Sequence, residues 1–135
     1  MVNELPDMTL KAIGVVRNKV SKTPKHGYDW RGIVSDIEID SRLSEALDNL
    51  DKFSHVIILY WMHRLSETDR HLLRAHPMGE RSREVRGVFA LRSPMRPNPI
   101  GSTVVDLVEV RGEVLLVRGL DALDGSPVVD IKIAR

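Results

Sequence analysis

The chain has 135 residues, of which 42% are hydrophobic and 29% are charged, and its formal net charge is only +1. This length and composition predict one globular domain, residues 1–135, and exclude a disordered or fibrous protein. The sequence contains no cysteine, which excludes disulfides and thiolate metal sites and is typical of a reducing cytoplasm. Residues 1–7 lack the features of a secretion signal, and no apolar run approaches the ~20 residues of a membrane span. We therefore expect a soluble, cytoplasmic protein with no membrane partner.

Seven apolar or alternating segments have the composition of β-strands. They are, in chain order, residues 9–17, 33–39, 53–62, 86–91, 101–110, 114–118 and 128–133. The third segment is almost continuously apolar and rich in β-branched and aromatic residues, which is typical of a strand buried on both faces. The aromatic residues near its end, Tyr60 and Trp61, are expected in the core, with stacking on a nucleobase as the alternative.

One short helix is expected between the second and third strands. Asp40 or Ser41 can cap its N-terminus, and its apolar face is formed by Leu43, Ala46, Leu47 and Leu50. Seven strands and one short helix predict an all-β or β-dominated fold, which is either a barrel or a sandwich.

The stretch 64–96 contains arginines but no lysine. These arginines are Arg64, Arg70, Arg74, Arg81, Arg83, Arg86, Arg92 and Arg96. Such a bias favours the planar, bidentate recognition of phosphate or carboxylate. The alternative is a solvated face held together by local ion pairs. Residues 65–85 follow no regular pattern, and we interpret them as a surface loop with a function.

Residues 91–102 contain three prolines between two predicted strands. Each proline fixes its own φ and restricts the residue before it, so Ser93, Arg96 and Asn98 are held in a narrow range of backbone shapes. Polar side chains on a stiff loop lose less entropy when they bind a ligand. The segment is therefore a candidate binding loop, although its composition also fits an ordinary proline-rich turn.

A second candidate element is the turn at Asp124-Gly125. Asp121, Asp124 and Asp130 place three acids around this turn, which would be costly if they were buried together and useful if a cation lay among them. As a turn alone, the segment needs no further explanation. The histidine spacing contains no metal-binding pair, so no metal site is expected. No dinucleotide-binding or phosphate-loop motif occurs, which argues against those nucleotide-binding folds.

Five segments, in order along the chain, together resemble one family. They are residues 13–17 (Ile-Gly-Val-Val-Arg), 53–55 (Phe-Ser-His) with His63 after them, 87–93 (Gly-Val-Phe-Ala-Leu-Arg-Ser), 96–101 (Arg-Pro-Asn-Pro-Ile-Gly) and 120–132 with its Asp-Gly-Ser-Pro core. The chain resembles the TrmO family, also called TsaA-like, of S-adenosylmethionine-dependent tRNA methyltransferases. The resemblance implies a single-sheet β-barrel domain that works as a homodimer and binds S-adenosylmethionine without a Rossmann fold. The implied reaction is methylation of the exocyclic nitrogen of threonylcarbamoyladenosine beside the tRNA anticodon.

The resemblance also implies which residues contact the cofactor. By motif position they are His63, Arg64, Arg92, Ser102, Leu120 and Asp121, with the Asp124-Gly125 turn nearby. Where the family has a Pro-Arg-Gln-like cofactor segment, this chain has Pro24 and Lys25.

Methyl transfer from a sulfonium mainly requires alignment of nucleophile, methyl and sulfur. We expect Asp121 or Asp124 to face the amine or sulfonium of the donor, and Arg92 and Arg96 to face carboxylate or phosphate. The proton acceptor is Asp124, His63 or a water. These assignments require the proline-rich segment and the aspartate turn to enclose one cavity.

For the RNA, we expect contacts from six residues of the basic stretch and the proline-rich segment. They are Arg70, Arg74, Arg81, Arg83, Arg96 and Asn98. Two alternatives stay open: a non-catalytic RNA-binding β-barrel, and a methyltransferase that acts on another small acceptor.

Overall fold

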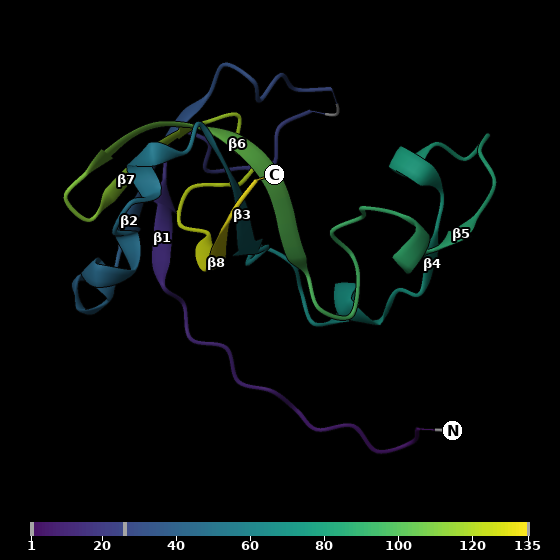
Figure 1. The fold of residues 1–135 in the computed structure, drawn as a ribbon. Helices are drawn as coiled ribbons and strands as arrows, with labels where there is room; N and C mark the ends of the chain where they lie inside the picture. The colour runs from purple at the N-terminus through teal and green to yellow at the C-terminus, as the bar shows by residue number, and fades with distance from the viewer. Residues whose placement is uncertain (1, 26, 135) are drawn as a thin grey trace.

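The computed structural model describes residues 2–25 and 27–134. Its main feature is a closed barrel of six antiparallel strands in the order β1-β2-β7-β6-β3-β8 (Figure 1). The barrel strands are β1 (Gly14–Arg17), β2 (Val34–Ile39), β3 (His55–Trp61), β6 (Ile100–Arg111), β7 (Val114–Arg118) and β8 (Pro127–Ile133). The prediction of a β-dominated, single-sheet barrel is thereby confirmed, and the sandwich alternative is wrong.

The core fills the inside of the barrel because successive side chains of a strand point to opposite faces. In β3, Val56, Ile58 and Tyr60 are buried, while the residues between them are only half-buried. The prediction that this strand is buried on both faces is therefore wrong. In a closed barrel only one face of a strand meets the interior, so a continuous apolar run does not require two covered faces.

The predicted strand 86–91 does not belong to the barrel. Only β5 (Arg86–Gly87) is extended, and it pairs with β4 (Arg74–Ala75) in a separate two-stranded sheet. The chain then turns through the 3-10 helix η5 (Val88–Ala90), in which Val88 is buried and Phe89 is 84% exposed. A short apolar run cannot distinguish a strand from such a turn, since both can bury a single side chain.

The predicted helix is present as two 3-10 segments, η1 (Ser41–Leu47) and η2 (Leu50–Lys52). The Asp40 carboxylate accepts the N–H of Arg42, so the predicted cap is confirmed. Leu47 and Leu50 pack against the core, but Leu43 is largely exposed. Asn49, with a left-handed φ of 68°, separates the two segments and prevents one continuous α-helix.

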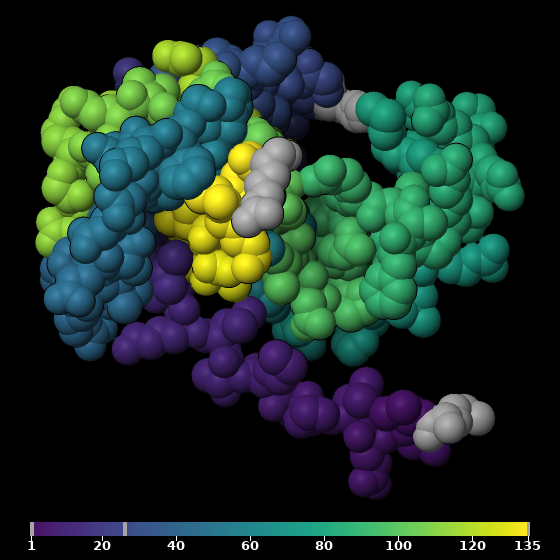
Figure 2. Space-filling view, viewed as in Figure 1, coloured from purple at the N-terminus to yellow at the C-terminus, as the bar shows by residue number. Residues whose placement is uncertain are grey.

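Residues 62–99 form an arm that leaves the barrel between β3 and β6. The arm contains η3 (Thr68–His71), β4, η4 (Pro77–Gly79), β5 and η5. At its base the Met62 N–H donates to the Pro99 carbonyl across 2.8 Å, so both ends of the arm are fixed to the barrel. Figure 1 shows β4 and β5 projecting to one side, and Figure 2 shows the molecule hollowed between the arm and the barrel. Across the described ranges, no helix has the length and hydropathy of a membrane span.

Candidate functional site

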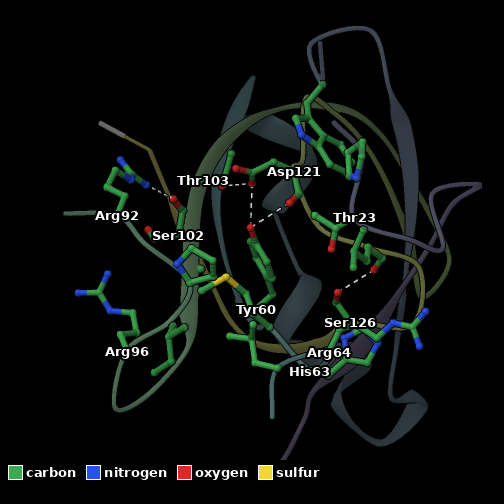
Figure 3. Close-up of a pocket in the computed structure, with 18 of the residues that line it drawn as sticks. Thr23, Tyr60, His63, Arg64, Arg92, Arg96, Ser102, Thr103, Asp121 and Ser126 are labelled. Atoms are coloured by element: carbon green, nitrogen blue, oxygen red, sulfur yellow. Dashed lines mark hydrogen bonds between the residues drawn. The ribbon is translucent and has the colours of Figure 1, made fainter. Parts of the chain in front are cut away.

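A cavity of about 1160 Å³ lies where three segments meet the end of β3 and the start of β6. The segments are the proline loop (residues 91–99), the acidic turn (residues 121–126) and the first loop (residues 18–25 and 27–33). The predicted convergence of the proline-rich segment and the aspartate turn is therefore confirmed. Figure 3 shows Arg92 and Arg96 on one side of Tyr60, with His63 and Arg64 on the other.

Most of the cofactor contacts implied by sequence line this cavity. Those that do are His63, Arg64, Arg92, Ser102 and Asp121, together with Pro24 and Lys25. Arg96 and Asn98, which were predicted to contact the RNA, line the cavity as well. Leu120 does not, because it is completely buried in the barrel core. Asp124 and the arm residues Arg70, Arg74, Arg81 and Arg83 are also absent from the lining.

The Asp121 carboxylate is held at the cavity wall by two hydroxyl groups. Tyr60 Oη donates to Oδ1 across 2.9 Å, and Thr103 Oγ1 donates to the same oxygen across 2.5 Å (Figure 3). Within the described part of the chain, the other carboxylate oxygen, Oδ2, accepts no hydrogen bond. This arrangement orients a negative charge whose second oxygen is available to a ligand.

The Tyr60 phenol is suited to this role because it stays protonated. Burial raises the pKa of Tyr60, and the neighbouring Asp121 carboxylate raises that pKa further. A phenol that keeps its proton can only donate to the carboxylate, so the hydrogen bond persists across the physiological pH range.

Arginines of the proline loop fix its backbone while lining the cavity. Arg92 Nη2 donates to the Ser102 carbonyl. Arg96 Nη1 donates to the carbonyls of Leu91 and Ser93, each across 3.1 Å. Each of these hydrogen bonds uses a single guanidinium nitrogen, which leaves the guanidinium charge at the cavity wall.

Arg70 lies outside the cavity and is hydrogen-bonded to the proline loop. Its Nε donates to the Pro97 carbonyl across 2.7 Å and its Nη2 donates to Asn98 Oδ1 across 3.2 Å. The same guanidinium lies 5.4 Å from the centre of the Trp61 ring and pairs with Glu67. These contacts use three of its five N–H donors, and the predicted role of Arg70 in RNA binding stays a prediction.

The other predicted RNA contacts on the arm differ in their availability. Arg83 pairs with Glu80 across 3.0 Å, and its carbonyl accepts a hydrogen bond from His76. Arg74 and Arg81 are exposed and form no side-chain hydrogen bond or ion pair with the residues that the structure describes. The local ion pairs weighed as an alternative therefore apply to Arg83 and Arg70.

The Asp124 carboxylate fastens the acidic turn to the end of β1. Its Oδ1 accepts the N–H of Asn18 across 3.0 Å, while its own N–H donates to the Val20 carbonyl across 2.8 Å. The Asn18 side chain in turn donates to the Ala122 carbonyl and to the buried Ser35 hydroxyl. These contacts explain the acid at position 124 structurally, without a cation. Over residues 2–25 and 27–134, no three potential metal-ligating side chains lie together.

His63 lines the cavity in a partly desolvated position. Burial and the positive charge of Arg64 lower the pKa of His63, and Asp124 opposes them only in part. The imidazole is therefore neutral near pH 7, and either of its tautomers has one acceptor nitrogen. His63 therefore brings a nitrogen that can accept a proton to the cavity wall, whereas Asp124 lies outside the lining.

Of the wall that the first loop contributes, Pro24 and Lys25 were identified from the sequence, whereas further residues were missed. Thr23, Tyr28 and Trp30 line the cavity from this loop. The rings of Tyr28 and Trp30 pack edge to face, with centroids 4.9 Å apart. Two aromatic residues in an otherwise polar loop were the available signal, since polar loops rarely carry rings without a packing or binding role.

Comparisons of sequence give a consistent result. The family model described as the tRNA-methyltransferase O N-terminal domain matches residues 15–133. A probable S-adenosyl-L-methionine-binding protein of Methanothermobacter thermautotrophicus is 45% identical over 129 residues, which cover 93% of this chain and 89% of that protein. An S-adenosyl-L-methionine-binding protein of Archaeoglobus fulgidus is 47% identical over 128 residues, which cover 93% of this chain and 88% of that protein.

Solved structures are similar over the whole barrel and arm. The crystal structure of TrmO from Pseudomonas aeruginosa superimposes with a TM-score of 0.75 at 31% identity, covering 98% of this chain and 58% of the solved chain. Another crystal structure of TrmO gives a TM-score of 0.75 at 30% identity, covering 96% of this chain and 58% of the solved chain. The chain thus spans a little over half the length of these solved proteins.

Proposed function

The chain belongs to the tRNA-methyltransferase O N-terminal domain family, and from this premise we propose that it is an S-adenosylmethionine-dependent methyltransferase. The proposed acceptor is the exocyclic nitrogen of threonylcarbamoyladenosine beside the anticodon of tRNA. The observation that carries the proposal is a single cavity lined by an oriented carboxylate, several guanidinium groups and a neutral imidazole. Relatives named for binding S-adenosylmethionine support the choice of cofactor.

The charged groups of the cavity suit the methionine half of the cofactor. S-adenosylmethionine carries an amine, a sulfonium and a carboxylate. The available oxygen of Asp121 suits the amine or the sulfonium, and the guanidinium of Arg92 suits the carboxylate. Leu120 has 0% of its surface exposed, so its role is to support Asp121 from the core.

Methyl transfer needs an acceptor for one proton. The acceptor nitrogen attacks the methyl carbon, the carbon–sulfur bond breaks with its electrons returning to sulfur, and the proton on nitrogen must leave. His63 takes this proton in our proposal, because it lines the cavity and is neutral. Asp124 stays the alternative acceptor, although its carboxylate is engaged by the N–H of Asn18.

The arm supports the proposed RNA contact. Arg74 and Arg81 are exposed near β4 and β5, where they can reach phosphates without breaking an ion pair. Arg96 and Asn98 line the cavity and are proposed to contact the nucleoside itself. The family and this surface together favour tRNA over a small acceptor.

We also infer that the protein works as a homodimer in the cytoplasm, where its tRNA substrate is found. Leu73, Met78 and Phe89 are large apolar side chains that the arm leaves exposed, and a second copy of the chain that covered them would remove this apolar surface from water. Sedimentation at micromolar concentration tests this inference. A monomer at that concentration would refute the homodimer without affecting the proposed chemistry.

The decisive experiment measures radiolabel transfer from S-adenosylmethionine to two tRNA preparations, one carrying threonylcarbamoyladenosine and one lacking it. We expect label only in the modified tRNA. Label in neither preparation but in a small nucleoside would favour a different acceptor, and label in no acceptor would leave the non-catalytic RNA-binding barrel. Calorimetry with Arg92→Ala should show weakened S-adenosylmethionine binding. Arg111→Ala, which removes an exposed arginine paired with Glu109, is the matched control.

A further inference from the structure

The cavity is larger than a site for one small molecule usually is. Typical sites for small molecules enclose about 300–1,000 Å³, whereas this one encloses about 1160 Å³. Its walls also differ in chemistry. The charged groups Asp121, Arg92 and Arg96 come from the acidic turn and the proline loop, while the first loop contributes the rings of Tyr28 and Trp30. The charged wall suits the methionine half of the cofactor, and the aromatic wall suits a planar ring.

The aromatic wall is accessible, since Tyr28 is exposed and Trp30 is half-buried. Tyr28 is 41% exposed, and its ring meets the edge or face of Trp30 at an interplanar angle of 77°. Of the remaining aromatic residues, Tyr60 is committed to Asp121 and Trp61 lies beneath Arg70. Phe53 and Phe89 do not line the cavity.

The backbone around the two rings is anchored before any ligand binds. The Tyr28 N–H donates to the Lys25 carbonyl across 3.1 Å, and the Ile33 N–H donates to the Trp30 carbonyl across 3.0 Å. Between the rings, Asp29 accepts hydrogen bonds from the backbone and side chain of Arg31. Because the backbone that carries Tyr28 and Trp30 is already ordered, the two rings lose little entropy when a base stacks on them.

We propose that Tyr28 and Trp30 form the binding site for the purine of the acceptor nucleoside, opposite the charged wall that takes the cofactor. The assignment rests on the proposed methyltransferase function and deepens it. A base of an RNA loop must be unstacked before its exocyclic nitrogen can reach a methyl donor, and aromatic side chains replace the stacking it loses. The amine, sulfonium and carboxylate of the cofactor are better matched by Asp121 and Arg92, and calorimetry with the cofactor separates the acceptor purine from the cofactor's own adenine.

The test separates the two ligands. Trp30→Ala and Tyr28→Ala are compared with wild type for S-adenosylmethionine affinity by calorimetry and for the KM of the acceptor tRNA. We expect each variant to raise the acceptor KM by about 5- to 150-fold, the range that corresponds to the loss of one stacking ring, with cofactor affinity changed less than about twofold. Trp30→Phe should recover most of the loss. Phe53→Ala is the matched control, because Phe53 is equally exposed (41%) but lies outside the cavity, and it should change neither quantity.

Two outcomes overturn the assignment: a loss of cofactor affinity as large as the loss in acceptor KM, and no change in either. A binding measurement keeps the test independent of activity. In a Trp61→Phe background, adenosine added to protein saturated with S-adenosylhomocysteine should quench the Trp30 fluorescence to a plateau. In a Trp30→Phe background, the remaining Trp61 signal should not change. If the wild-type protein methylates nothing but this quenching occurs, the proposed function fails and the purine site stands; if no quenching occurs, the purine site is refuted.

Discussion

Tyr60 and Gly101 face each other across strands β3 and β6, and the Tyr60 ring occupies the space that a side chain at position 101 would need. A Cβ at Gly101 would lie within 3.0 Å of the ring atoms Cζ, Cε1 and Cε2. The far end of this ring is not free to swing aside, since the hydroxyl is bonded to Asp121. The glycine that follows the proline loop therefore allows the phenol to reach the cavity wall.

Gly101→Ala should lower both stability and cofactor affinity. Overpacking at this contact is expected to cost about 1–3 kcal/mol of unfolding free energy, and displacement of the phenol removes one of the two donors to Asp121. Thermal or denaturant unfolding and S-adenosylmethionine calorimetry measure the two effects. Gly32→Ala is the control, because a Cβ there would meet no atom within 4 Å.

A double-mutant cycle identifies the cause. In a Tyr60→Ala background the space beside position 101 is empty, so Gly101→Ala should cost much less there than in the wild type. The same cost in both backgrounds would mean that the ring is not what excludes a side chain at Gly101.

The convergence of the two main cavity segments was predictable from sequence because both have strong local signals. Three prolines restrict the backbone of the proline loop, and Asp124-Gly125 specifies a turn. Both effects are local and do not depend on the rest of the fold. The barrel strands were recognisable because alternation persists over several residues, as it does in β2. The prediction of a strand at residues 86–91 was wrong because the segment buries a single side chain, Val88, and one buried residue does not establish the two-residue alternation of a strand.

The roles of individual charged residues were not predictable in the same way. Arg70 and Arg96 both belong to the arginine-rich stretch, yet their roles differ. Arg70 is bonded to the proline loop from outside the cavity, whereas Arg96 lines the cavity. The difference depends on contacts between residues 27 positions apart, such as Arg70 with Pro97, which only the folded chain brings together. Asp124 likewise has a structural partner, Asn18, more than 100 positions away.

Asp121→Asn should weaken cofactor binding through the loss of charge. Asparagine has nearly the same size and can still accept hydrogen bonds from Tyr60 and Thr103, so the fold of the cavity should persist. We expect S-adenosylmethionine affinity to fall about tenfold or more, in line with the value of a hydrogen bond to a charged group. The affinity for 5′-methylthioadenosine, which lacks both the amine and the sulfonium, should change far less. Equal losses for the two ligands would show that Asp121 does not face a positive charge.

The pH dependence of methyl transfer should report on His63. Only the neutral imidazole can accept a proton, so the rate should fall as the pH drops through the pKa of His63. Burial and Arg64 lower this pKa, which places the midpoint of the acidic limb below the ordinary histidine value of about 6.5. Arg64→Gln removes a positive charge that opposes protonation, so the limb should move to higher pH. Arg64→Lys keeps the charge and should leave the limb in place; superimposable profiles for wild type and Arg64→Gln would argue against His63 as the proton acceptor.

Arg74 and Arg81 should account for part of the salt dependence of tRNA binding. Each arginine that neutralises a phosphate releases counterions, so its removal lowers the slope of log affinity against log salt by about one. We expect Arg74→Gln and Arg81→Gln each to have this effect, and the double variant to lower the slope by about two. Arg111→Gln is the control, since Arg111 lies on the β6–β7 hairpin, across the barrel from the arm in Figure 1. If the slopes of the three arm variants equal that of wild type, the phosphates of tRNA do not contact Arg74 or Arg81, because an exposed arginine cannot neutralise a phosphate without displacing its counterions.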